Sequence, residues 1–159
     1  LHLIGEMLKR DAQIDLSHIP YKGTPQALND LAGGHVQVMF GAIPTLLPMI
    51  RSGRGRALAV TTAKRADALP ELLTMQEQGI SMDIPSWYGL MASAAVPQAT
   101  IDKAYQAMVM TLNQMQVKER LLAQGLIPVV NRPQEFAAQI QRETAVWARV
   151  IREANIKAE

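Results

Sequence analysis

The sequence predicts an α/β fold built around a mostly parallel sheet. Apolar strand-like segments alternate with helical segments over the first 79 or so residues, and this alternation is typical of a parallel sheet covered by helices on both faces. Residues 56–61 are short and almost continuously apolar, as expected of a strand buried on both faces. With 48% hydrophobic and 19% charged residues in a chain of 159, the composition is that of a globular protein.

The first half is expected to contain helices wherever apolar residues recur every three or four positions, and strands wherever they alternate. Thr24 followed by Pro25 is typical of a helix start, and Gly33-Gly34 of a helix end. The expected elements are a helix over 1–8, a strand over 14–19, a helix over 24–32, a strand over 35–40, a helix over 43–51, a strand over 56–61 and a short helix at 75–78.

The second half changes character after Gly79 and is mainly helical. Phe136, Ile140, Trp147 and Ile151 recur at helical spacing along the last predicted helix. The expected elements are a long strand over 85–92, helices over 97–114 and 117–124, a short edge-like segment over 127–130 and a helix over 132–155.

Parallel sheets carry ligands at the carboxyl ends of their strands. The two loops that follow predicted strands in this way therefore contain the candidate binding residues. They are Tyr21-Lys22-Gly23-Thr24 and Phe40-Gly41-Ala42. The helix start after Lys22 offers free N–H groups and a positive charge, which favour an anion such as a carboxylate. The alternative is an ordinary capped turn with a solvated lysine. Trp87 and Tyr88 line a cleft or anchor the core, and the residues alone leave both open.

Several functional classes are disfavoured. The net charge is only +2 and basic residues never exceed two in a row, which argues against nucleic-acid binding. The absence of cysteine excludes a disulfide scaffold and a thiol nucleophile. His2, His18 and His35 match no metal-ligand spacing, and no phosphate loop or nucleophile elbow occurs. We therefore expect a binding protein without catalytic residues, metal or cofactor.

A series of short motifs in order then identifies a family resemblance. Residues 18–23 read H-I-P-Y-K-G, residues 27–31 A-L-N-D-L, residues 56–61 R-A-L-A-V-T and residues 87–89 W-Y-G. In this order and spacing, the chain resembles the substrate-binding proteins of tripartite tricarboxylate transporters, the Bug or TctC family.

The resemblance implies a periplasmic-binding-protein-like fold of type II, in which two lobes close like a Venus flytrap over a ligand. It implies that this chain is incomplete, with the signal peptide and most of the first lobe preceding Leu1. Residues 1–85 would be most of lobe two, and residues 86–159 the hinge strand and the C-terminal helical part of lobe one.

The implied function is extracytoplasmic capture of a small carboxylate, a di- or tricarboxylate or an amino acid, for the membrane permease subunits of the transporter in the periplasm. Tyr21 to Thr24 and Phe40 to Ala42 would form one wall of the cleft, with Trp87 and Tyr88 reaching it from the hinge. A receptor that presents the same ligand to a membrane sensor kinase is the alternative, and an enzyme on the same fold is a weaker one. Apolar faces left open by the missing part would be buried in a dimer or an exchanged assembly.

Overall fold

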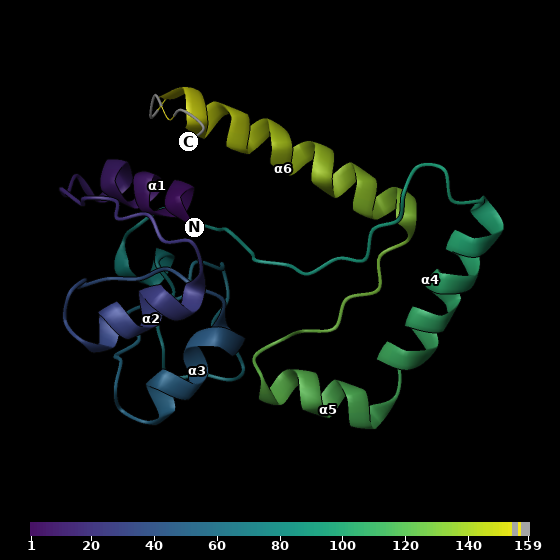
Figure 1. Ribbon diagram of the computed structural model, residues 1–159, viewed down its shortest axis with the longest axis horizontal. Coiled ribbons are helices and arrows are strands. Elements are labelled where there is room, and N and C mark those ends of the chain that lie inside the picture. Colours follow the sequence, from purple (N-terminus) through teal and green to yellow (C-terminus); the bar gives the residue numbers. More distant parts are fainter. Residues whose placement is uncertain (154–155, 157–159) are drawn as a thin grey trace.

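The computed structural model describes residues 1–153 and residue 156. Its helices are α1 (His2–Ala12), α2 (Thr24–Ala32), α3 (Ile43–Arg51), the 3₁₀ turn η1 (Gln76–Gln78), α4 (Gln98–Leu112), α5 (Met115–Ala123) and α6 (Pro133–Glu153). Helices α1 to α3 and their loops lie together on one side of the molecule, and α4 and α5 lie on the other (Figure 1). The last helix, α6, runs back across the top to reach α1.

The helices lie where the sequence predicts them, within a few residues at each end. Predicted ranges 97–114, 117–124 and 132–155 correspond to α4, α5 and α6. Residues 154 and 155 of the last predicted range lie outside the described residues.

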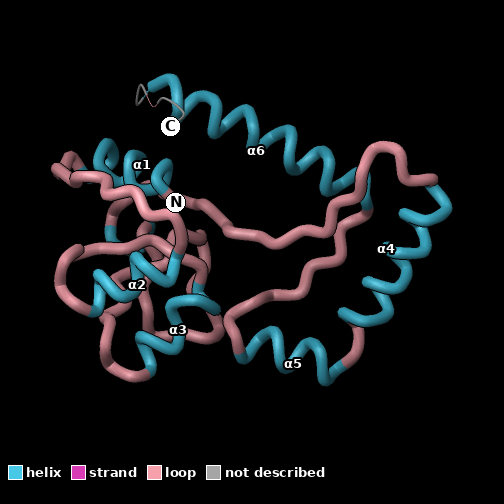
Figure 2. Tube along the Cα trace, viewed as in Figure 1, coloured by secondary structure: helices cyan, strands magenta, loops and turns pink. Residues whose placement is uncertain are grey.

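The predicted sheet is the main error. Among the described residues no strand forms, and the segments 14–19, 35–40, 56–61, 85–92 and 127–130 are extended or irregular (Figure 2). The single β-bridge is parallel and joins Val60 to Thr74. A strand is defined by its hydrogen-bonded neighbour, and an apolar extended segment without one is not a strand. The sequence pattern indicates which segments are able to form strands. Among the described residues, few of these segments have a neighbouring segment to pair with.

Residues 56–61 come closest to the prediction. The Val60 N–H donates to the Leu73 carbonyl at 3.1 Å, and the Val60 carbonyl accepts the Met75 N–H at 2.9 Å. On the other side, the Thr61 carbonyl accepts the Ile84 N–H at 2.8 Å. This segment therefore holds three stretches of chain together at the centre of the α1–α3 side.

The core of the α1–α3 side lies around this bridge. Thr74 and Met82 are each only 1% exposed, and Val60, Leu69 and Leu47 are also buried. Thr74 is the buried polar residue of the group, and its hydroxyl accepts the Glu77 N–H at 3.1 Å. The buried hydroxyl therefore has a hydrogen-bond partner, as buried polar groups normally do.

Helices α5 and α6 return the C-terminal part to the α1–α3 side. Helix α6 contacts α1 near the buried Val150, and the Arg10 guanidinium pairs with Glu153 at 2.9 Å. At the end of α5, Gly125 has a φ of 76°, and a Cβ built on it would lie 2.5 Å from the Ile43 side chain at the start of α3. Glycine is needed at this junction both for its backbone conformation and for the close approach.

Candidate functional site

The first predicted loop leads directly into α2. Gly23 is the N-cap residue, in an extended conformation, and the helix starts at Thr24 as the sequence predicts. Thr24 is the first helical residue and Pro25, which has no N–H, the second. No side chain caps this helix, so the N–H groups of its first turn are not taken by a capping side chain.

Tyr21 holds this loop against α2. Its hydroxyl donates to the Asp30 carboxylate at 2.7 Å, which joins the residue before the turn to the far end of the helix. This hydrogen bond to Asp30 raises the pKa of Tyr21 above its ordinary value of 10.0. Lys22 is exposed beside it. The hydroxyl of Tyr21 is therefore engaged in positioning the turn, while the ammonium of Lys22 faces solvent.

The second predicted loop leads into α3 in the same way. Ala42 is the N-cap, and its carbonyl accepts the N–H groups of Thr45 and Leu46 at 3.0 and 3.1 Å. Phe40 lies against α1, since a Cβ built on Gly5 would be 3.5 Å from its ring. Gly41 is enclosed by Leu46, whose side chain would be 3.1 Å from an added Cβ.

The first turn of α1 brings the two loops together. The His18 ring, just before the first loop, stacks on His2 of α1 with a 3.7 Å centroid separation and 5° between the planes. Phe40, at the start of the second loop, packs on Gly5 of the same turn. The N-terminal ends of α1, α2 and α3 all lie toward the side from which the long connecting segments leave (Figure 1). Each helix N-terminus contributes a partial positive charge to that side.

Trp87 and Tyr88 are placed differently from each other. The Trp87 indole N–H donates to Glu143 of α6 at 2.7 Å, and its ring meets Phe136 edge-on at 4.9 Å. Tyr88 is 70% exposed. Within the described part of the chain, no hydrogen bond or ring contact joins either residue to the two loops. The structure assigns Trp87 the role of anchoring residues 85–92 to α6.

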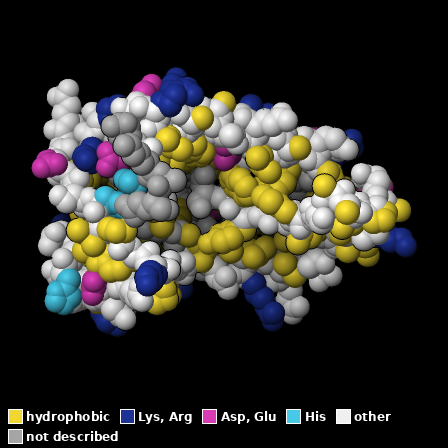
Figure 3. Space-filling model, turned by 45° about the horizontal axis from the view of Figure 1, so that its top comes forward, with side chains coloured by type: hydrophobic (Ala, Val, Ile, Leu, Met, Phe, Trp, Pro, Cys, Tyr) yellow, Lys and Arg dark blue, Asp and Glu magenta, His cyan; other side chains and the backbone are white. Residues whose placement is uncertain are grey.

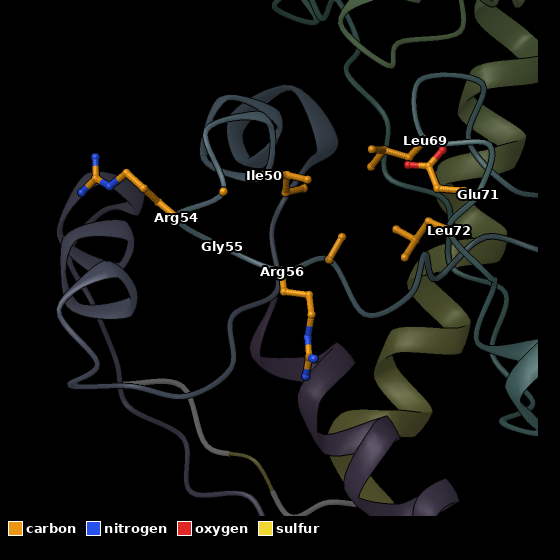
Figure 4. A pocket seen from close by; sticks show the side chains of 9 residues that line it. Ile50, Arg54, Gly55, Arg56, Leu69, Glu71 and Leu72 are labelled. Atoms are coloured by element: carbon orange, nitrogen blue, oxygen red, sulfur yellow. The ribbon is translucent and has the colours of Figure 1, made fainter.

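Sequence reasoning did not single out an open pocket of about 500 Å³ beyond the C-terminal end of α3. Its floor is apolar, from Ile50, Leu69 and Leu72. The side chains of Arg54 and Arg56 point in different directions, and Glu71 lies on the opposite wall (Figure 4). Because the two guanidinium groups diverge and a carboxylate lies opposite them, the pocket does not form an anion-binding site. The repeated Arg-Gly pattern of residues 53–56 was the signal in the sequence for this turn.

Metal binding and membrane insertion find no support in the described residues. They contain no cluster of three His, Asp or Glu side chains placed to hold a metal ion. None of the helices they form has the length and apolar character needed to cross a bilayer.

Comparison with known proteins identifies the relatives of this chain. Residues 1–156 match the model of the family described as "Tripartite tricarboxylate transporter family receptor". Protein BugT of Bordetella pertussis is 33% identical over 157 residues, which cover 98% of this chain and 48% of that protein. The chain therefore spans about half the length of BugT.

Solved structures agree with this match. Rpa4515 from R. palustris, solved with adipate, superimposes with a TM-score of 0.92 at 30% identity, over 98% of this chain and 52% of that one. A periplasmic transporter superimposes with a TM-score of 0.91 at 35% identity, over 99% and 53%. MatC from Rhodopseudomonas palustris, solved with bound malate, gives 0.82 at 28% identity, over 94% and 52%.

The described backbone thus has the conformation of half of a periplasmic solute receptor, even though it forms no sheet. The family is one of transport receptors, in agreement with the prediction of a non-catalytic binding protein. The chain belongs to the tripartite tricarboxylate transporter receptor family, also called TctC.

Proposed function

We propose that this chain is part of an extracytoplasmic receptor that captures a small carboxylate and delivers it to the permease subunits of a tripartite tricarboxylate transporter. The observation that carries the proposal is the match of nearly the whole chain to receptors solved with adipate and malate. Both molecules are dicarboxylates, so a shared site for carboxylate groups is the simplest common chemistry. The same relatives include a protein described as periplasmic, which supports placing this receptor in the periplasm.

The carboxylate site we propose is the wall formed by Tyr21 to Thr24 and Phe40 to Ala42. The start of α2 offers N–H groups that no side chain caps, with the exposed ammonium of Lys22 beside them. Backbone donors and a nearby cation bind carboxylates through short, charge-assisted hydrogen bonds. Phe40 contributes an apolar surface for the carbon chain of the ligand, next to Gly41.

Residues 1–85 belong, in this proposal, to lobe two, and residues 86–159 to the hinge strand and the returning part of lobe one. Closure of the two lobes would bury the ligand and shift the receptor toward its closed form. Of the two aromatic residues predicted at the hinge, Tyr88 keeps a role in contacting ligand because it is exposed. Trp87 is held by Glu143 and Phe136 and is still 36% exposed, so in this proposal it can also reach the ligand from the hinge.

Calorimetric titration of the full-length receptor with adipate and with malate tests the site. Lys22→Ala and Thr24→Ala should each weaken binding by about one to two orders of magnitude, since each removes a polar group beside the same N–H donors. Lys103→Ala, which removes an exposed lysine from α4, is the matched control and should leave the affinity unchanged. Equal affinities in all four proteins would remove this loop from the site, and the absence of binding heat with both acids would contradict a carboxylate receptor.

A further inference from the structure

Two histidine rings lie face to face beside the first predicted loop. His2 belongs to the first turn of α1 and His18 lies shortly before Tyr21. Their ring centroids are 3.7 Å apart with 5° between the planes, and we call this pair the histidine stack. His18 is exposed, and histidine side chains reach the surface on the α1–α3 side of the molecule (Figure 3). The histidine stack can therefore exchange protons with the solvent.

The histidine stack is one of two attachments that hold the first loop. The Tyr21 hydroxyl donates to Asp30 at 2.7 Å and fixes the loop to α2, whereas the His18 ring fixes the chain before the loop to α1. Tyrosine and aspartate side chains ordinarily titrate far from neutral pH, while an ordinary histidine titrates at about pH 6.5. Between neutral pH and pH 5, the histidine stack is therefore the attachment whose charge changes.

Glu6 balances one positive charge on the histidine stack. Its carboxylate lies one turn along α1 from His2, at 3.7 Å from Nε2 of that ring. It also lies 3.3 Å from the ammonium of Lys9. A proton on His2 therefore faces a carboxylate that is already shared with one cation.

The other charged groups nearby leave His18 without a carboxylate among the described residues. On the loop side, Asp15 and Lys22 are exposed, and no hydrogen bond or ion pair joins either of them to the His18 ring. From α6, Glu153 pairs with Arg10 at the other end of α1. A charged imidazole can stack on a neutral one, but two charged rings face to face repel each other. A second proton on the histidine stack therefore favours its separation.

We propose that the histidine stack positions the carboxylate-binding loop and releases it in acid, so that the affinity of the receptor falls when both rings are protonated. This inference rests on the proposed function, in which Tyr21 to Thr24 bind the carboxylate. Helix α1 also carries the second loop, because Phe40 packs on Gly5. Separation of the rings therefore moves the first loop relative to the second.

The direction of the pH effect follows from the extra proton. Above about pH 6.5 the rings share at most one proton, and the loop stays against α1. Below that value the released loop binds one proton more than the stacked one, so ligand affinity is lost as the pH falls. A difference of one proton limits the change to about tenfold per pH unit.

Calorimetric titration of the full-length receptor with adipate and malate at pH 7.5 and pH 5.0 tests this proposal. His18→Phe keeps a ring that can stack on His2 and removes one of the two titrating groups. At pH 7.5 it should bind as tightly as the unchanged receptor, and at pH 5.0 about tenfold more tightly. The ligand's own carboxyl groups protonate equally in both titrations, so they do not affect this comparison.

Two further variants separate positioning from a general effect of the substitution. His18→Ala removes the ring and should weaken binding at both pH values. His35→Phe makes the same change as His18→Phe at an exposed histidine outside the histidine stack, and it should follow the unchanged receptor at both pH values.

Nuclear magnetic resonance of the imidazole C–H protons follows the histidine stack without any ligand. In the unliganded receptor, the two rings should titrate in two separate, coupled steps, and the amide signals of Lys22 to Thr24 should shift with the second. In His18→Phe, the His2 ring should titrate in a single step.

Two results would overturn the proposal. One is a single-step titration of each ring, with that of His2 unaltered in His18→Phe, whether or not either acid binds. The other is equal affinity of the unchanged receptor and His18→Phe at pH 5.0, in proteins that bind at pH 7.5. Failure of every protein to bind either acid at either pH contradicts the proposed function instead, and the resonance titration then decides whether the two rings share their protons as proposed.

Discussion

At the scale of single residues, the best-defined polar cluster is the one that closes the turn after the bridge. The Thr74 N–H donates to the Glu77 carboxylate at 2.8 Å, and the Glu77 N–H donates back to the Thr74 hydroxyl, which makes a capping box. The Arg65 guanidinium binds the same carboxylate through Nε and Nη2, at 3.0 and 2.7 Å. These contacts hold the buried Thr74 beside Val60.

The Glu77 cluster should make stability depend on acid pH. The hydrogen bond from Arg65, followed by that from the Thr74 N–H, lowers the pKa of Glu77 from 4.5 to about 2. Because the folded-state pKa is lowered, the stabilisation is fully present above pH 4.5 and is lost as the pH falls toward 2. Glu77→Gln should therefore lower the melting temperature at pH 7, with the difference shrinking toward pH 2.

Thermal unfolding followed by circular dichroism at several pH values measures this. Glu119→Gln, a change at an exposed glutamate of α5 for which the described residues show no ion pair, serves as the control. A Glu77→Gln difference that stays constant from pH 7 to pH 2 would show that the carboxylate charge is not what stabilises the turn.

The contacts of Trp87 are also visible only at the residue scale. From the sequence, a cleft residue and a core anchor were equally good descriptions. The hydrogen bond to Glu143 and the edge-on contact with Phe136 attach it to α6, and its role toward a ligand stays a prediction. Its partners lie about 50 residues away in the chain, so no local pattern could have identified them.

At the scale of elements, a glycine follows the end of α2 and another follows the end of α5, and each allows the chain to turn there. Gly34 and Gly125 both have a φ of 76°, a conformation that side chains other than glycine rarely adopt. Nothing lies within 4 Å of a Cβ built on Gly34, whereas one built on Gly125 would lie 2.5 Å from Ile43 and 3.3 Å from Ala68. The two positions therefore share a left-handed backbone conformation and differ in packing.

Gly34→Ala and Gly125→Ala form a matched pair that separates strain from packing. Gly34→Ala should cost about 1–2 kcal/mol, the penalty of a left-handed conformation. Gly125→Ala should cost that amount plus about 1–3 kcal/mol, because Ile43 has to move to admit the methyl group. Urea unfolding of both variants gives the two values. Equal losses would mean that the end of α5 does not pack on α3 in solution.

At the scale of the whole molecule, the chain is least protected where it crosses between its two sides. Among the described residues, the segments 85–92 and 127–131 make no backbone hydrogen bond, while the α1–α3 side has a buried core around Val60 and Thr74. A protease reaches a segment when its backbone is free to leave the fold.

Brief thermolysin digestion of the isolated chain should therefore cut first within residues 85–92 and 127–131. This protease cleaves before large apolar residues, and Leu90, Met91, Ile127 and Val129 are all more than 60% exposed. Mass spectrometry of the earliest fragments should show products ending or beginning at these residues. First cuts within α2 or α3 would contradict this distribution of stability.

The sequence determined the helices and the family. Helical periodicity and helix-ending glycines are local signals, and they placed α1 to α6 within a few residues. The motif at residues 18–23 and those that follow it identified the family, because their order is specific even though each motif is short. The same reasoning selected the loops before α2 and α3, which the structure brings together on the first turn of α1.

Only the tertiary structure decided which segments pair. An alternating apolar pattern shows that a segment can be a strand, but pairing requires a neighbour whose position depends on distant parts of the polypeptide. Val60 finds such a neighbour in Thr74, whereas residues 85–92 and 127–131 find none among the described residues. The contacts of Trp87 with α6 and the packing of Gly125 on Ile43 also depend on the tertiary structure. Contacts between residues far apart in the chain leave no local pattern in the sequence.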